Sequence, residues 1–276
     1  MMYPNLFVIG APKSGTTTLF EIFKQCNDIY TPKVKEIHFF SRSLVEDSYY
    51  SVSIPDGVEN YLSLYNGANG EKFLLDCSPS YLYSRDAADE ISDLGREVKV
   101  VIMLRDPVAR SVSHYAMDLS KGFVNVPLNE ILNNPNAYPK HYYQYVELSK
   151  YESHVALWAE KVGGNNLFFI FMDEMREAPQ KVLANLSGFL GVEISEFSGD
   201  HLISNAAFMP KNRFIVWVRQ NKLLFGIYHV MPAWLKRMVS QVVTKPMQSK
   251  PVDEDEKEKL AEILKDSVCY YQNLKG

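Results

Sequence analysis

The sequence predicts an α/β fold in which helices flank a parallel β-sheet. Three apolar runs have the length and composition of buried strands, namely Leu6–Ile9, Val98–Leu104 and Asn166–Phe171. The second is almost continuously apolar, as expected for a strand that is covered on both faces in a parallel sheet. Each run is followed by a segment with a helical pattern, and strands that alternate with helices are typical of α/β proteins.

Length and composition fit one large α/β domain or two small ones. The chain has 276 residues, of which 46% are hydrophobic and 22% charged, as in ordinary soluble proteins. Its net charge of −4 creates no global field that favours a nucleic acid. Three distant cysteines (Cys26, Cys77 and Cys269) indicate neither a metal site nor a disulfide framework. Without a signal peptide or a membrane-spanning run, we expect a cytoplasmic protein.

A glycine-bounded loop, Gly10–Gly15, joins the first predicted strand to the first predicted helix. Backbone N–H groups and the positive end of the helix dipole favour an anion at such a junction. A nucleoside triphosphate loop ends in Gly-Lys-Ser/Thr, whereas here Thr16 follows Gly15 and the lysine, Lys13, lies within the loop. Taken alone, the segment has a second interpretation, an ordinary strand-to-helix turn with a surface lysine.

The next segment, Lys33–Phe40, is predicted to be a loop that turns into a short helix beside the first strand. It contains Glu36, which is either a solvated loop carboxylate or, close to an anion-binding loop, a candidate general base. A tyrosine-rich helical segment is predicted over 47–68. A strand follows at Lys72–Asp76, and ligands gather at the carboxyl ends of such strands. The loop after it therefore faces the first loop or is a turn with a packing tyrosine.

A second strand–helix junction follows Val98–Leu104. Arg105 comes at the strand end, Pro107 suits a helix start, and Ser113 lies about two turns into that helix. A guanidinium fork and a hydroxyl suit a phosphate dianion. Further along we expect a polar insertion or lid over 120–137, an amphipathic helix over 142–162 that carries a packing or surface His154, a helix over 179–190, and a closing helix over 253–271.

Taken in order, these motifs resemble those of sulfotransferases that use 3′-phosphoadenosine 5′-phosphosulfate (PAPS), of the heparan sulfate and bacterial glycan type. The matching blocks are Pro-Lys-Ser-Gly-Thr-Thr at 12–17, Lys-Glu-x-His-Phe-Phe at 35–40, Ser-Pro-Ser-Tyr at 78–81, and Arg-Asp-Pro at 105–107 with Ser113. The resemblance spans roughly Asn5 to Gly191. Cys77 departs from it, because the glycan enzymes often have lysine there. The second cation near the transferring group is then missing or comes from elsewhere.

The resemblance implies a P-loop-like three-layer fold with a central parallel sheet of four to five strands flanked by helices. It implies a single sulfotransferase domain over 1–276, with a PAPS-binding core over 1–191 and a C-terminal lid and closing helix over 192–276. The implied reaction moves the sulfuryl group from PAPS to a hydroxyl or amine of a small natural product, glycolipid or saccharide. It leaves 3′-phosphoadenosine 5′-phosphate (PAP), needs no metal, and suits a bacterial enzyme.

The resemblance also implies roles for individual residues. Glu36 is the catalytic base, and Lys13 donates to the oxygen that bridges sulfur and phosphorus. The residues implied to bind PAPS are Lys13, Ser14, Gly15, Thr16, Thr17, Thr18, Arg105, Ser113, Lys211 and Arg213. The further substrate candidates are Lys35, His38, Asp76, Ser78 and Tyr81.

Several alternatives stay open at this point. A P-loop kinase-like phosphotransferase would need a lysine after Gly15, and a non-catalytic PAP-binding module would not need Lys13 and Glu36. The aromatic segment 214–239 suits a lid, a homodimer surface or a peripheral membrane contact. The sequence does not choose among these, and it does not identify the acceptor or distinguish O-sulfation from N-sulfation.

Overall fold

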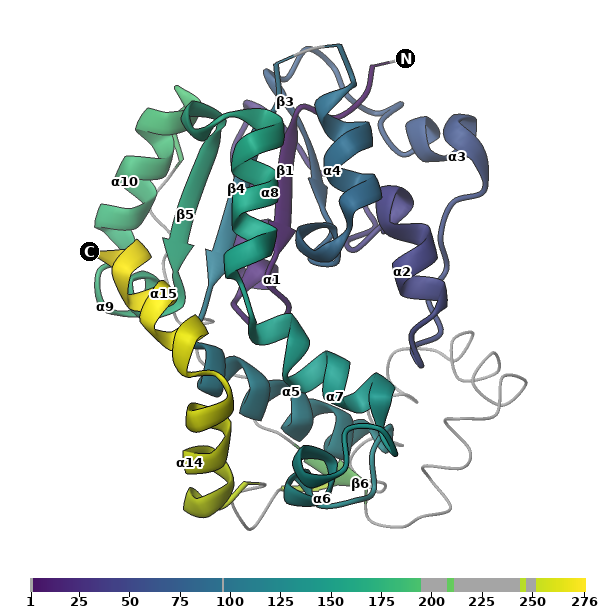
Figure 1. Ribbon diagram of the computed structural model, residues 1–276. Helices are drawn as coiled ribbons and strands as arrows, with labels where there is room; N and C mark the ends of the chain where they lie inside the picture. The colour runs from purple at the N-terminus through teal and green to yellow at the C-terminus, as the bar shows by residue number, and fades with distance from the viewer. Residues whose placement is uncertain (1, 96, 195–207, 211–243, 247–251) are drawn as a thin grey trace. The chain divides into compact units, whose positions relative to one another are not determined.

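The computed structural model describes residues 2–95, 97–194, 208–210, 244–246 and 252–276. The chain divides into two compact units (Figure 1), the first made of 1–110, 148–202 and 264–276 and the second of 111–147 and 203–263. The prediction of one domain over 1–276, divided near residue 191, stays a prediction.

In the first unit the strands are β1 (Leu6–Gly10), β2 (Ile29–Tyr30), β3 (Phe73–Cys77), β4 (Lys99–Leu104) and β5 (Leu167–Phe171). Its α-helices are α1 (Thr16–Phe23), α2 (Arg42–Glu46), α3 (Gly57–Ser63), α4 (Arg85–Ser92), α8 (Glu152–Val162), α9 (Met172–Glu177), α10 (Pro179–Leu190) and α15 (Lys265–Lys275). Its 3-10 turns are η1 (Phe39–Ser41), η2 (Tyr81–Tyr83), η3 (Glu147–Ser149, which begins one residue before the unit boundary) and η4 (Gly164–Asn166).

Among the described residues, these five strands form one parallel sheet in the order β2-β3-β1-β4-β5. The predicted parallel sheet of four to five strands is therefore confirmed. The three neighbours β3, β1 and β4 are the strands that precede the three predicted functional loops. Because the carboxyl ends of parallel strands meet at one edge of a sheet, the topology brings these loops together.

The sheet is the core of the first unit because both of its faces are covered. Every residue of β1 and β3 is buried, and all of them except Asp76 are apolar or glycine. On one face, side chains such as Val8 and Met103 form a cluster with α1 and α10. Helices α4 and α8 cross the face turned to the viewer in Figure 1. There the indole N–H of Trp158 on α8 donates to the Leu82 carbonyl at 3.2 Å.

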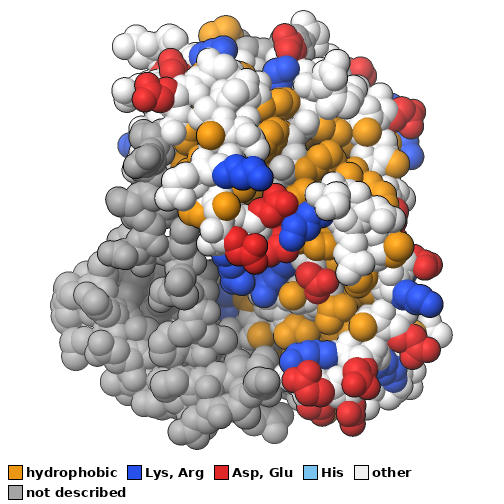
Figure 2. All heavy atoms as spheres, turned by 90° about the vertical axis from the view of Figure 1, so that its left-hand side faces the viewer, with side chains coloured by type: hydrophobic (Ala, Val, Ile, Leu, Met, Phe, Trp, Pro, Cys, Tyr) orange, Lys and Arg blue, Asp and Glu red, His pale blue; other side chains and the backbone are white. Residues whose placement is uncertain are grey.

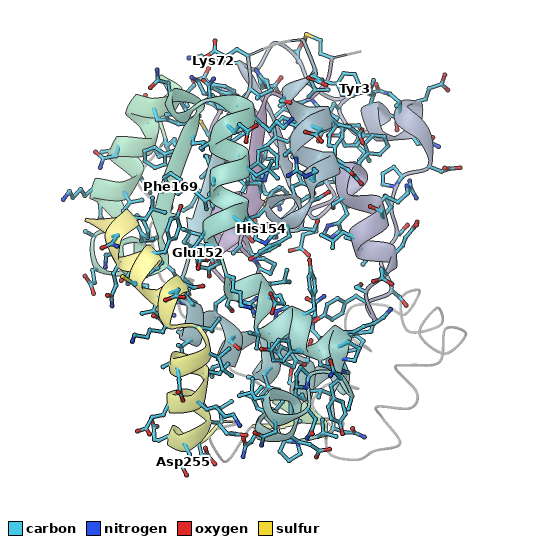
Figure 3. All side chains as sticks on the ribbon, viewed as in Figure 1. Tyr3, Lys72, Glu152, His154, Phe169 and Asp255 are labelled. Atoms are coloured by element: carbon cyan, nitrogen blue, oxygen red, sulfur yellow. The ribbon has the colours of Figure 1, made fainter. Side chains whose placement is uncertain are left out.

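Helix ends in this unit follow the predicted signals. Helix α10 begins at Pro179 and is closed by Gly191 in the left-handed conformation, φ 61°. The ammonium of Lys72, labelled in Figure 3, donates to the carbonyls of Leu190 and Gly191 at 2.9 Å each. A cation at the C-terminal end of a helix is favoured by the helix dipole.

Three helix predictions were wrong in extent, and one helix was not predicted. The segment 47–68 is helical only over Gly57–Ser63, and Pro55, just before this helix, disfavours helical geometry in the residue that precedes it. The segment 142–162 is divided between two helices, and in the turn between them the buried guanidinium of Arg110 donates to the Ser149 hydroxyl at 2.7 Å. The closing helix is also two helices, and α9 was not predicted.

His154 lies on α8 next to Glu152 in Figure 3. Its ring packs edge-on against Tyr83, with 4.9 Å between ring centroids. The packing interpretation of this histidine therefore agrees with the structure.

The second unit contains most of α5 (Pro107–Lys121), together with α6 (Leu128–Asn133), α7 (Pro139–Tyr145), α14 (Glu254–Ile263) and the antiparallel pair β6 (Phe208–Pro210) and β7 (Thr244–Pro246). Within it, the Tyr145 hydroxyl donates to the Asp118 carboxylate at 2.9 Å. The Asn129 N–H at the start of α6 donates to Glu256 on α14 at 2.9 Å. The predicted insertion over 120–137 thus contains a helix, and its role as a lid stays a prediction.

Lys211, Arg213 and the segment 214–239 lie outside the described residues. Within the described part, no helix combines the length and apolar character needed to cross a membrane. Lys and Arg side chains lie among Asp and Glu side chains on the face shown in Figure 2. This face therefore carries charge of both signs, in keeping with the modest net charge.

Candidate active site

The loop after β1 is shaped by close approach of the backbone and by left-handed residues. A Cβ at Gly10 would lie 2.7 Å from Cβ of Leu82, so only glycine fits there. Gly15 precedes α1 with φ 95°, and Lys13 has φ 73°. The loop is tied to the sheet by the Ala11 N–H, which donates to the Met103 carbonyl at 2.6 Å.

This loop ends where α1 begins, at Thr16. The first N–H groups of an α-helix have no partner within the helix, so they are available to an anion. Thr17 is exposed and Thr18 half-buried, whereas Ser14 is fully buried and its N–H donates to the Ala11 carbonyl at 3.2 Å. The structure therefore places Gly15, Thr16 and Thr17 at the start of α1 and turns Ser14 into the protein.

The loop after β4 meets the first loop. Nη1 of Arg105 donates to the carbonyl of Lys13 at 3.3 Å, so the guanidinium points toward the glycine loop. The Arg105 carbonyl accepts from the Tyr151 hydroxyl at 2.9 Å. Asp106 caps α5 by accepting the Ala109 N–H at 2.8 Å, which leaves Arg105 just outside the helix.

Arg105 is half-buried and lies near a second guanidinium. Burial and the nearby guanidinium of Arg176 lower the pKa of Arg105 from its ordinary value. Sequence reasoning missed Arg176 because its helix, α9, was not predicted, although basic residues in a last helical turn are a usual signal. Ser113 lies in the second turn of α5, in the second unit.

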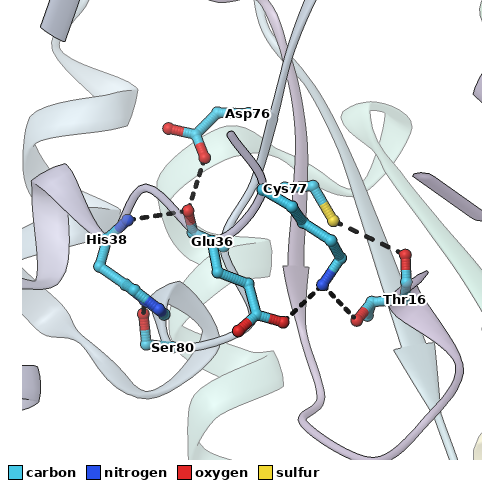
Figure 4. Close-up of polar contacts among 8 residues, drawn as sticks. Thr16, Glu36, His38, Asp76, Cys77 and Ser80 are labelled. Carbon is cyan, nitrogen blue, oxygen red and sulfur yellow. Dashed lines mark hydrogen bonds and ion pairs between the residues drawn. The ribbon is translucent and has the colours of Figure 1, made fainter. Parts of the chain in front are cut away.

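Glu36 lies in the loop between β2 and η1, next to the carboxyl end of β3. Its carboxylate is 2.5 Å from the ammonium of Lys35, and that ammonium is 3.4 Å from the Thr16 hydroxyl at the start of α1 (Figure 4). The Glu36 side chain is 49% exposed, whereas that of Lys35 is 15% exposed. One lysine thus connects an accessible carboxylate to the anion-binding end of α1.

A buried network holds this loop in place. The Asp76 carboxylate is fully buried and accepts hydrogen bonds from the hydroxyls of Ser78 at 2.6 Å and of Tyr61 and Tyr81 at 2.8 Å each. Ser78 in turn accepts the His38 N–H at 3.0 Å (Figure 4). Burial raises the pKa of Asp76, and the three hydroxyl donors oppose that rise.

Asp76, Ser78 and Tyr81 were candidates for substrate contact, with a packing turn as the alternative. All three side chains are fully buried and bonded to one another, so the structure supports the packing turn. Their contribution is to fix the backbone of residues 36–38, where the Glu36 N–H donates to the Cys77 carbonyl at 3.0 Å. Among the described residues, the non-glycine residues with positive φ are Lys13, Glu36 and His38. Such conformations persist where surrounding structure holds them.

Cys77 carries no charge at neutral pH. Its thiol is buried at the end of β3 and lies 3.8 Å from the Thr16 carbonyl, and burial raises its pKa to about 12. The cation next to this position is Lys35, whose charge acts on Cys77. Among the residues that the structure describes, no group of His, Cys, Asp or Glu side chains could hold a metal ion.

His38 is buried, and its Nδ1 lies 2.6 Å from the Ser80 hydroxyl. Burial lowers its pKa from 6.5 to about 4, against an opposing effect of Glu36. Between about pH 4 and pH 6.5, the unfolded chain therefore binds a proton at His38 that the folded protein does not bind. The stability that neutral His38 contributes is complete above pH 6.5 and is lost as the pH falls toward 4.

We expect His38→Asn to reduce the pH dependence of the unfolding free energy between pH 7 and pH 4. Asparagine tolerates the left-handed backbone at this position, φ 58°, and does not titrate. At about 1.4 kcal/mol per pH unit, the wild-type protein should lose about 3 kcal/mol more unfolding free energy than the variant between pH 7 and pH 4. Urea unfolding at both pH values measures this difference. Parallel losses in the two proteins would exclude His38 as its source.

Comparisons with known proteins converge on one family. A family model described as "Sulfotransferase domain" matches residues 3–219. Human heparan sulfate glucosamine 3-O-sulfotransferase 3B1 is 25% identical over 193 residues, which is 69% of this chain and 46% of that protein. The membrane-associated sulfotransferase kil1 of Dictyostelium discoideum is 32% identical over 115 residues, 41% of this chain and 22% of that protein. The chain thus spans about half the length of the heparan sulfate relatives it matches.

Solved structures show the same fold. A sulfotransferase from Alicyclobacillus acidocaldarius aligns with a TM-score of 0.64 at 24% identity, over 86% of this chain and 100% of that one. Mouse sulfotransferase SULT7A1, crystallised with PAP, aligns with a TM-score of 0.51 at 16% identity, over 96% of this chain and 83% of that one. At these identities the likeness concerns the fold.

Proposed function

This chain belongs to the sulfotransferase domain family, and from that premise we propose that it transfers a sulfuryl group from PAPS to a hydroxyl or amine of an acceptor. The observation that carries the proposal is the meeting of three parts at one edge of the sheet. These are the glycine loop with Lys13, the guanidinium of Arg105 directed at that loop, and the carboxylate of Glu36 joined to Thr16 through Lys35.

The residues present fit a doubly phosphorylated nucleotide. The N-terminus of α1 and the Thr16 and Thr17 hydroxyls would hold the 5′-phosphate. Arg105, with Ser113 on the helix that follows it, would read the 3′-phosphate through a planar fork of donors and a hydroxyl. Arg176 adds positive charge near Arg105. Lys211 and Arg213, outside the described residues, stay proposed phosphate contacts.

PAPS supplies the sulfuryl group: its sulfur–oxygen bond to the 5′-phosphate breaks while a bond from sulfur to the acceptor atom forms. Lys13 would donate to the bridging oxygen, which keeps the electron pair of the broken bond. Glu36 would accept the proton of the attacking hydroxyl or amine. Transfer of this kind depends mostly on positioning and on fixed charges, as phosphoryl transfer does.

The proposed acceptor is a saccharide, a glycolipid or a small natural product. The printed names of the heparan sulfate relatives support a saccharide, and the near-balanced charge supports a short or weakly charged one. Incubation of the protein with sulfur-labelled PAPS and a panel of such acceptors, with a metal chelator present, tests the proposal. We expect labelled acceptor and an equal amount of PAP.

Two other results would replace this proposal. Binding of PAP without transfer to any acceptor in the panel would indicate a non-catalytic nucleotide-binding module. Formation of ADP from ATP and Mg²⁺ with the same acceptors would indicate a kinase-like phosphotransferase.

A further inference from the structure

Lys35 lies between the proposed 5′-phosphate position and the carboxylate that is proposed to accept the acceptor proton. Its ammonium is 3.4 Å from the Thr16 hydroxyl, where the 5′-phosphate would bind, and 2.5 Å from the Glu36 carboxylate, which would receive the acceptor proton. In the proposed reaction the sulfuryl group moves from the 5′-phosphate to an acceptor atom beside Glu36, so the ammonium lies close to its path.

The lysine of this ion pair is more buried than the cation of six other ion pairs among the described residues, where the Lys or Arg side chain is between 21% and 40% exposed. The side chains of Lys24 and Arg42, which pair with glutamates on α1 and α2, are 40% and 37% exposed. The Lys35 side chain is only 15% exposed. A partly buried ammonium acts more strongly on a neighbouring anion than one that is surrounded by water.

Apart from the Glu36 carboxylate, the neighbours of Lys35 do not neutralise its charge. The Cys77 thiol and the His38 ring, on both of which its charge acts, are neutral at pH 7 because burial disfavours their charged forms. Its contacts among the described residues are one hydroxyl and one carboxylate oxygen. An ammonium has three donors, so a third remains for a ligand oxygen.

We propose that Lys35 is a further catalytic residue, which donates a hydrogen bond to the sulfuryl oxygens during transfer. The proposal rests on the proposed function, since it assumes PAPS at the end of α1. Three non-bridging oxygens of the sulfuryl group share negative charge while the bond to the 5′-phosphate breaks and the bond to the acceptor forms. A fixed cation beside them stabilises that charge distribution. The acceptor proton still goes to Glu36.

PAP lacks the sulfuryl group of PAPS. A comparison of the two affinities therefore measures the proposed contact between Lys35 and that group. We expect Lys35→Met to weaken PAPS binding by about tenfold to a hundredfold, as for loss of one charged hydrogen bond, with a much smaller effect on PAP. Lys33→Met is the matched control, because it removes the same charge from an exposed position in the same loop. Lys35→Arg should recover part of the PAPS preference.

Isothermal calorimetry with PAPS and with PAP, on the full chain and these three variants, decides the question. Unchanged PAP affinity in Lys35→Met shows that the fold and the nucleotide site survive. Equal losses for PAPS and PAP, or a PAPS affinity equal to that of Lys33→Met, would overturn the role of Lys35 and leave the proposed function standing. Wild-type protein that binds neither nucleotide would instead overturn the proposed function itself.

Discussion

Replacement of Glu36 by Gln is expected to lower turnover by about 10²–10⁴-fold, the usual contribution of a general base. The amide has nearly the shape of the carboxylate but cannot take up the acceptor proton. Because Glu36 lies on the acceptor side of Lys35, PAP affinity should barely change. Turnover measured with labelled PAPS and the acceptor found in the panel, together with PAP calorimetry, checks both parts of this prediction.

Glu46→Gln is the matched control for this experiment. Glu46 is an exposed glutamate on α2 that pairs with Arg42 at 3.3 Å, so the same chemical change is made outside the site. We expect turnover close to that of the wild type. Near-normal turnover of Glu36→Gln would remove Glu36 as the base, and a large loss of PAP affinity would show that this variant damages the nucleotide site.

Arg105→Ala should weaken PAP far more than AMP. The two nucleotides differ by the 3′-phosphate, and a charge-assisted contact to it contributes about 1.5–3 kcal/mol, or about tenfold to a hundredfold in affinity. Arg105 also donates to the Lys13 carbonyl, so its loss could loosen the glycine loop. Such loosening would affect both nucleotides, because both carry the 5′-phosphate.

The ratio of the two affinities therefore serves as an internal control. Arg105→Lys keeps the charge but not the planar fork, and we expect an intermediate ratio. Calorimetric titration of PAP and AMP into each variant gives these values. Equal losses for PAP and AMP in Arg105→Ala would assign Arg105 to loop structure and remove it from 3′-phosphate recognition.

The sequence predicted the parallel sheet and the loops at its edge well, because buried strands and glycine or proline junctions are local signals. The run Val98–Leu104 and the turn to Pro107 can be recognised without any tertiary contact. Helix extent was predicted less well. The turn that divides 142–162 contains Ser149, which accepts a hydrogen bond from the buried Arg110, and no periodicity reveals such a contact.

Site chemistry shows the same limit. Lys13 and Arg105 could be placed because each belongs to a motif at a strand end. The hydrogen-bond network around Asp76 could not be predicted, because it includes Tyr61 from a separate helix. In this network the Asp76 carboxylate is buried and holds the neighbouring loop, and it is not a surface group. From the sequence, Lys35 is one substrate candidate among several. The position of its ammonium between Thr16 and Glu36 depends on the tertiary structure.

Thermal unfolding of the wild-type protein with PAP, with AMP, and with ATP and Mg²⁺ is the most direct test of the two phosphate-binding loops. A ligand that binds the folded state raises the unfolding temperature, and at a given concentration a ligand that binds more tightly raises it more. We predict a clear increase with PAP and a much smaller one with AMP or with ATP and Mg²⁺. A larger increase with ATP and Mg²⁺ than with PAP would contradict a site built for a 3′,5′-bisphosphorylated adenosine.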